Sequence, residues 1–95
     1  MNGLTLDAVL VMSEDVVTQE LEGEMVLLSL DRAEYFGLNA TGTVMWNALV
    51  NGRTLREIAA TVAQDFAVDA QRASDDVLTL AQHLIDAGLA RTKDA

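Results

Sequence analysis

Short apolar runs and turn signals alternate through the first half of the chain. Residues 8–12, 16–21 and 25–30 are rich in apolar and β-branched side chains, a composition typical of strands. Glu22-Gly23 separates the second run from the third and is a tight-turn signal. The polar residues 31–34 then turn the chain into a last run at 35–38. The pattern therefore predicts two consecutive hairpins and a three-stranded antiparallel sheet.

Both faces of this predicted sheet carry apolar side chains. If Leu30 pairs with Tyr35 across the turn, Leu28 lies on their face of the sheet, because side chains alternate along a strand. The opposite face then holds Met25, Leu27, Phe36 and Leu38. Two alternatives follow. The N-terminal residues 4–12 fold over the second face, or an apolar surface is left for a partner.

Residues 39–66 have the signals of two helices. Asn39 or Thr41 is suited to cap a helix that ends at Asn51-Gly52, where glycine tolerates the left-handed conformation. Thr54 and Glu57 have the spacing of a capping box, and the following apolar residues recur every three or four positions as far as Phe66. The pattern predicts a short buried helix and then an amphipathic one.

A longer third helix is predicted from Asp69, as its cap, to Gly88. Its apolar stripe is wider than one packing contact needs, and the helical wheel places three polar residues beside Leu80. These are Arg72, Asp76 and His83. Either the stripe packs against both other helices, or one shoulder of it is free to form a groove with a polar rim. The predicted fold class is α+β, a three-stranded antiparallel sheet followed by three helices.

Composition and charge limit the possible functions. The 95 residues predict a single domain, 1–95, without proline or cysteine, so disulfides and thiolate metal sites are excluded. No signal peptide and no apolar run of about 18 residues is present, which favours the cytoplasm and no membrane partner. The net charge is −9, and residues 1–36 hold eight acidic side chains against Arg32 alone. This acidity favours a partner with basic residues, or simply maintains solubility.

Enzyme chemistry finds no support in the sequence. His83 is the sole histidine, and no second imidazole or thiolate accompanies it, so we predict no catalytic residue, metal or cofactor. Three helices with a strand-rich flank are also compatible with a winged-helix DNA-binding regulator. Its recognition helix would need basic residues, whereas the third helix offers Arg72 against several aspartates. Nucleic acid is therefore not a predicted partner, and the regulator remains a minor alternative.

A family resemblance rests on residues at the junctions between predicted elements. They are Tyr35-Phe36-Gly37-Leu38-Asn39, Gly42, Trp46, Gly52, Glu57-Ile58, Asp76-Val77, Leu84 and Gly88-Leu89. With this spacing the chain resembles the PqqD-like family of RiPP recognition elements, which bind the leader segment of ribosomally made precursor peptides. The resemblance covers residues 16–89 and implies a winged helix-turn-helix-like arrangement, in agreement with the fold derived from the pattern.

The resemblance implies that the leader adds as an antiparallel strand beside the third strand and inserts side chains between that strand and the third helix. The implied peptide-binding residues are Leu30, Asp31, Arg32, Ala33, Glu34, Tyr35, Phe36, Gly37, Arg72, Asp76, Leu80 and His83. Main-chain bonds are expected from Asp31, Ala33 and Tyr35, or in the other register from Arg32, Glu34 and Phe36. Tyr35, Phe36 and Leu80 are expected to form an apolar pocket, and Glu34 and Asp76 to attract cationic leader residues.

The resemblance further implies a non-catalytic protein that delivers its peptide to a separate enzyme. The chain ends shortly after Leu89 in a polar tail, residues 91–95, so no fused maturation enzyme is expected. The lasso-peptide type, which presents the leader to a leader peptidase, is preferred over the alternative, a PqqD-type peptide chaperone for a radical enzyme. The sheet face around Met25 and Leu27 is predicted as the docking surface for the processing enzyme.

Overall fold

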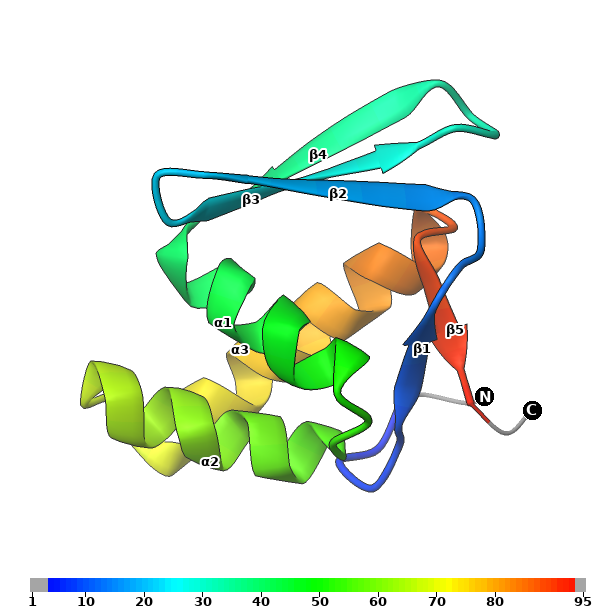
Figure 1. Ribbon diagram of the computed structural model, residues 1–95. Helices are drawn as coiled ribbons and strands as arrows, with labels where there is room; N and C mark the ends of the chain where they lie inside the picture. Colours follow the sequence, from blue (N-terminus) through cyan, green and yellow to red (C-terminus); the bar gives the residue numbers. More distant parts are fainter. Residues whose placement is uncertain (1–3, 94–95) are drawn as a thin grey trace.

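The computed structural model describes residues 4–93. Its strands are β1 (Leu10–Met12), β2 (Val16–Leu21), β3 (Glu24–Ser29), β4 (Glu34–Leu38) and β5 (Ala90–Thr92), and its helices are α1 (Ala40–Val50), α2 (Leu55–Phe66) and α3 (Ala70–Asp86). In Figure 1, β2, β3 and β4 form one layer at the top of the molecule, and the helices lie beneath one face of it. The predicted α+β fold of three antiparallel strands followed by three helices is confirmed.

The first hairpin forms where the turn signal predicted it. β2 and β3 pair antiparallel, with Leu21 opposite Glu24, so the connecting loop is only Glu22 and Gly23. Both loop residues have positive φ, 53° and 84°, as a type I′ turn requires. This turn suits the right-handed twist of the strands and fixes their register.

In the second hairpin the predicted register is wrong by two residues. Tyr35 lies opposite Leu28 and not opposite Leu30, because the four-residue turn is formed by residues 30–33 and not by 31–34, with Ala33 at φ 54°. A shift of two residues preserves the alternation of side chains. The predicted division of the two faces therefore remains correct: Leu28 and Tyr35 share one face, and Leu27 and Phe36 share the other.

Asp15 explains why the turn begins at Leu30. Its Oδ2 accepts hydrogen bonds from the Asp31 N–H at 3.0 Å and from the Ser29 hydroxyl at 3.3 Å. The Ser29 oxygen in turn accepts the Arg32 N–H at 3.3 Å, and the Leu30 N–H donates to the Asp15 carbonyl at 3.0 Å. The loop before β2 thus supplies partners for the turn, which positions the start of β4.

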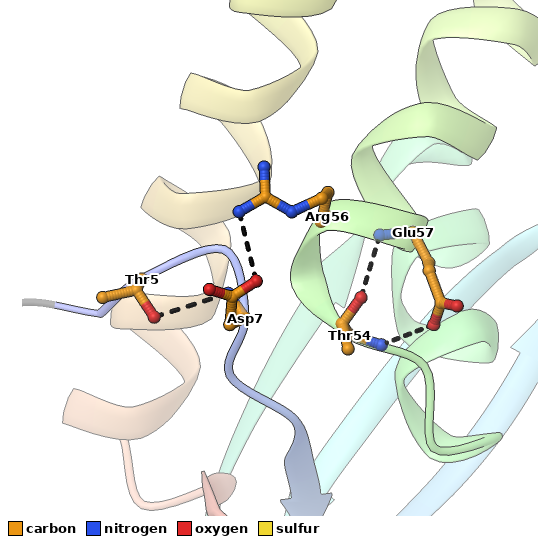
Figure 2. Close-up of polar contacts among 5 residues, drawn as sticks. All are labelled: Thr5, Asp7, Thr54, Arg56 and Glu57. Atoms are coloured by element: carbon orange, nitrogen blue, oxygen red, sulfur yellow. Dashed lines mark hydrogen bonds and ion pairs between the residues drawn. The ribbon is translucent and has the colours of Figure 1, made fainter.

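The N-terminal segment lies against the helices and not over the sheet. β1 pairs with β5, Leu55 N–H donates to the Ala8 carbonyl, and Arg56 N–H donates to the Leu6 carbonyl. Figure 2 shows the Arg56 guanidinium reaching Asp7, at 3.1 Å. The alternative in which residues 4–12 cover the second sheet face is therefore wrong.

Strand β5 was not predicted. Residues 90–92, partly within the expected polar tail, pair with β1, and residues 94–95 of that tail lie outside the described residues. Strands of three residues with partners about 80 positions away leave almost no local pattern, because their pairing depends on the packing of everything between them.

The helix boundaries follow the predicted caps. The Asn39 side chain accepts from the Gly42 N–H, and the Asp69 side chain accepts from the Arg72 N–H. Thr54 and Glu57 form the predicted capping box, with bonds of 3.1 and 2.9 Å (Figure 2). None of the helices in residues 4–93 is long and apolar enough to cross a membrane.

The hydrophobic core lies between the sheet and the helices. One sheet face contributes Met25, Leu27 and Leu38, and the helices contribute Trp46, Ile58 and Leu84, all buried. Further core residues are Leu10, Val16, Met45, Leu49, Leu55, Ala59, Val62, Ala73, Val77, Ala81, Leu89 and Ala90. Phe66, predicted on the buried face of its helix, is exposed at the end of α2, so the prediction is wrong for this residue.

A buried hydroxyl joins the ends of β3 and β4 to α1. Thr43 Oγ1 accepts the Met25 N–H at 2.9 Å and donates to the Leu38 carbonyl at 3.4 Å. We expect Thr43→Val to lower the free energy of unfolding by about 1–3 kcal/mol, because it leaves the Met25 N–H without that partner. Urea denaturation measures the change, and Thr43→Ser, which keeps the hydroxyl, is the control. Equal stability of the valine and serine variants would contradict this role.

Candidate functional site

The outer edge of β4 is unpaired within residues 4–93. The strand order is β2-β3-β4, and β1 and β5 form a separate sheet, so the N-terminal segment does not occupy this edge. Such an edge exposes main-chain N–H and C=O groups that an extended peptide can satisfy. The edge is therefore available for strand addition.

The hydrogen bonds of β3 identify which β4 residues face outward. The Leu30 N–H donates to the carbonyl of Asp15, the residue directly opposite it when the β2–β3 register is continued. Main-chain groups of successive residues in a strand point to opposite sides, so even-numbered residues of β3 hydrogen-bond to β2 and odd-numbered ones to β4. The Met25 N–H, which bonds to the Thr43 hydroxyl between the ends of β3 and β4, agrees with this alternation. Met25 lies opposite Leu38 and Leu27 opposite Phe36, so we infer that Phe36 and Leu38 bond inward.

Tyr35 and Gly37 therefore direct their main-chain groups to the free edge. This favours the odd register, Asp31, Ala33 and Tyr35, over the register of Arg32, Glu34 and Phe36. Asp31 and Ala33 lie in the turn, and the Asp31 N–H already donates to Asp15, so Tyr35 and Gly37 are the β4 residues whose main-chain groups are available at this edge.

An apolar groove of about 460 Å³ runs between β4 and α3. It is lined by Phe36, Gly37, Leu38, Leu80, His83, Leu84, Asp86 and Ala87. Phe36 reaches it because it lies on the helix-facing side of the sheet, and Leu80 reaches it because it is only half-buried at the edge of the α3 stripe. The free shoulder of the third helix, one of the two alternatives drawn from the sequence, is present in the structure.

A second, more polar hollow of about 420 Å³ continues along α3 toward the start of α1. Leu80 and His83 line both hollows, and Arg72 and Asp76 line the second one. Arg72 Nε lies 3.5 Å from Asp76 Oδ2, so the charge of this carboxylate is partly offset. Asp76 is accordingly a weaker attractant for cations than the sequence suggests.

The structure brings together only part of the predicted site. Phe36, Gly37, Leu80 and His83 line the apolar groove, and Arg72 and Asp76 line its polar continuation. Glu34 begins β4 on the Phe36 side of the sheet, while Leu30, Asp31, Arg32 and Ala33 form the turn before it.

Tyr35 is not part of the pocket predicted with Phe36 and Leu80. Adjacent residues in a strand point to opposite faces, and Tyr35 lies on the face away from the helices, 75% exposed. Its side chain adjoins the edge from the other side of the sheet. A peptide paired with β4 would thus meet Phe36 on one face and Tyr35 on the other.

Several groove residues were missed by sequence reasoning although the signal was present. Leu38 lies two positions from Phe36 on the same strand face, and Leu84 and Ala87 follow Leu80 at helical spacing. Thr79 in the second hollow had a similar signal, because it lies three positions after Asp76 on the same face of α3. Asn39, Thr41, Gly42 and Met45 had none, because they lie in α1 or just before it and come close to α3 only through the tertiary fold.

Arg32 takes a position that the sequence did not suggest. A Cβ on Gly88 would lie 3.0 Å from the guanidinium carbon of Arg32, so the arginine packs over the end of α3. Gly88 also has φ 76°, which favours glycine. The turn before β4 is thereby held against the helix that forms the other wall of the groove.

The predicted docking surface around Met25 and Leu27 is wrong. Both residues are buried beneath the sheet, on the face that packs against the helices. The open face carries Val17, Leu28 and Tyr35 in one row across the three strands, all exposed. No element within residues 4–93 covers this face (Figure 1).

Comparisons with known proteins agree with this arrangement. A solved structure described as TbiB1 in complex with the TbiA(beta) leader peptide is 28% identical, with a TM-score of 0.80, over 90% of this chain and 96% of that one. Another, described as lasso peptide synthetase B1 complexed with the leader peptide, shares the fold at 23% identity and a TM-score of 0.81, over 86% and 96%. No curated protein matches significantly.

The family profile described as coenzyme PQQ synthesis protein D (PqqD) matches residues 24–90. This match begins at β3 and extends into β5, so it contains β4, α3 and the groove between them. It covers well over half of the 95 residues. The chain belongs to the PqqD family and is a PqqD-like RiPP recognition element, as the Tyr35-Phe36-Gly37-Leu38-Asn39 run first suggested.

Proposed function

We propose that this protein binds the leader segment of a ribosomally synthesised precursor peptide, in the manner of the lasso-peptide type. The observation that carries the proposal is the unpaired β4 edge beside the apolar groove of Phe36 and Leu80. Main-chain bonds along an edge supply affinity for any extended peptide, and a neighbouring groove selects among side chains. The likeness to a solved structure with a bound leader peptide supports the same conclusion.

In this proposal residues 1–95 form one leader-binding domain that has no catalytic role of its own. It holds the leader for a separate maturation enzyme, such as a leader peptidase. The groove and its polar continuation carry Asp76 and Asp86 against Arg72, and the chain has a net charge of −9. A leader with both apolar and basic residues fits this combination best.

The direct test is to identify a small precursor-peptide gene beside this one and to measure, by fluorescence anisotropy, the binding of its labelled synthetic leader, called here the test leader. We expect saturable binding of the test leader and none of a labelled DNA duplex, because α3 presents an acidic surface. Failure of the test leader to bind, with the protein folded, would overturn the proposed function.

An N-methyl scan of the test leader examines the strand-addition geometry. Only guest residues opposite Tyr35 and Gly37 direct their N–H groups to β4, so we expect alternate N-methyl substitutions to weaken binding about tenfold. The intervening positions, whose side chains enter the groove, should tolerate N-methylation. Uniform sensitivity along the peptide, or none, would contradict strand addition.

A further inference from the structure

Gly37 is a glycine that the fold of the free protein does not require. Its φ is not positive, unlike those of Gly23, Gly52 and Gly88, so any residue fits its backbone conformation. A Cβ at this position would meet no heavy atom within 4 Å, so packing does not demand glycine either. A glycine inside a strand weakens the strand and often marks a close approach by a ligand or another chain.

The strand register places Gly37, with its missing side chain, at the edge of β4 where a guest strand would pair. Gln19, Val26 and Gly37 lie opposite one another across β2, β3 and β4, on the face away from the helices. Val26 is half-buried and Tyr35, two residues before Gly37 on the same face, is exposed. The missing side chain therefore leaves open space on this face at the edge of β4, next in the register to Tyr35 and Val26, and this space is called here the Gly37 slot.

We propose that this slot is a second subsite for the peptide, on the sheet face opposite the groove, and that it receives a large apolar side chain. The inference rests on the proposed function and adds to it. The guest residue opposite Gly37 presents its side chain on the Gly37 face, because directly opposed residues share a face. That side chain covers the glycine and reaches the Tyr35 ring diagonally, a distance that long or aromatic side chains span.

The peptide strand is then held from both faces of the sheet. Residues that alternate along the guest enter the groove beside Phe36 and Leu80, and the residue between them enters the Gly37 slot. This two-sided arrangement makes binding selective. A peptide strand with one apolar face and one polar face fills the groove or the Gly37 slot, but not both. The preferred peptide therefore has apolar side chains at the residue opposite Gly37 and at the residues next to it.

The Gly37→Val variant tests whether Gly37 serves peptide binding or the stability of the fold. Valine favours a strand, and its side chain enters open space, so we expect the melting temperature not to fall. A gain of about 1 kcal/mol in stability would raise it by about 4 °C or more. Binding of the test leader should nevertheless weaken about tenfold, because the valine fills the slot and forces the guest side chain aside. Gly37→Ala should weaken binding less.

Gln19→Val is the matched control, since it adds the same side chain to the same row but on β2, at the far edge of the sheet. Its affinity for the test leader should equal that of the wild type. Truncating the large leader residue opposite Gly37 to alanine should weaken binding to the wild type but have little further effect on the valine variant.

The outcomes distinguish the two proposals. If the wild type does not bind the test leader, the proposed function itself fails. If the wild type binds and Gly37→Val binds equally well, strand addition stands and the subsite is overturned. Equal losses in Gly37→Val and Gln19→Val would also overturn it, because the effect would not then belong to the β4 edge.

Discussion

Leu27→Asp is expected to prevent folding, whereas Leu28→Asp, one residue further along β3, is expected to leave the fold intact. Leu27 is 0% exposed beneath the sheet, and Leu28 is 37% exposed on the open face. An unpaired carboxylate at Leu27 should cost about 4 kcal/mol or more, a large part of the roughly 5–15 kcal/mol that stabilises a domain. At Leu28 the carboxylate remains hydrated, and the cost should be about 1 kcal/mol or less.

Circular dichroism and urea denaturation of the two variants measure this difference. The pair is matched in chemistry and strand, so the result depends on which face each residue occupies. Similar stabilities would mean that the sheet has slipped by one residue, since such a slip exchanges the two faces. The Leu28→Asp variant should also keep its affinity for the test leader within about threefold, because Leu28 lies one strand away from the guest.

The assignment of residues to the two faces of the sheet shows how much of the fold the sequence alone could predict. Alternation of apolar residues assigned Leu28 and Tyr35 to one face correctly, although the four-residue turn begins one residue earlier than predicted and the register is therefore shifted by two residues. The position of that turn depends on Asp15, a residue from a different loop, whose bonds to Ser29 and Asp31 no local pattern reveals. A register error of two residues thus leaves every side chain on its correct face, because side chains alternate with a period of two. The pattern of apolar residues therefore cannot reveal such an error, and the structure is needed to find it.

The caps of the helices were predictable for a different reason. Asn39, Thr54 and Asp69 bond to amides three residues later, so all of the information lies within one turn of sequence. Which sheet face the helices cover is not local information. The sequence left both faces apolar, and the choice of the Met25 and Leu27 face as an open docking surface was wrong for that reason.

The candidate site combines both kinds of information. The shoulder of α3 at Leu80 followed from the helical wheel, and the edge strand followed from the hairpins. Their adjacency in one groove came from family resemblance until the structure placed Phe36 and Leu80 together. The placement of Tyr35 outside the groove required the register, and in the proposed complex it leaves Tyr35 beside the outer face of the guest strand.

Leu80→Glu should abolish detectable binding of the test leader, with a loss of affinity on the order of 100-fold or more. The substitution removes an apolar wall of the groove, worth about 1.5–3 kcal/mol when a guest covers it. It also places a carboxylate where the guest strand would exclude water, and an unpaired charge there adds a further penalty. Together these exceed about 2.8 kcal/mol, which corresponds to 100-fold in affinity.

The fold should survive this change because Leu80 is only half-buried, and the glutamate can turn toward solvent when no guest is present. Leu80 also touches a small hollow shared with Met45 and Val77, so unfolding of each variant must be measured beside its binding. Gln71→Glu adds the same charge to an exposed position on the opposite side of α3, about 180° round the helix, and should bind normally, since its hydrogen-bond partner Asp75 lines neither hollow. Leu80→Met, close in volume, should bind within a few-fold of the wild type. Unchanged calorimetric titration of a folded Leu80→Glu variant would show that the guest does not enter this groove, and that the edge of β4 alone, or another surface, holds the peptide.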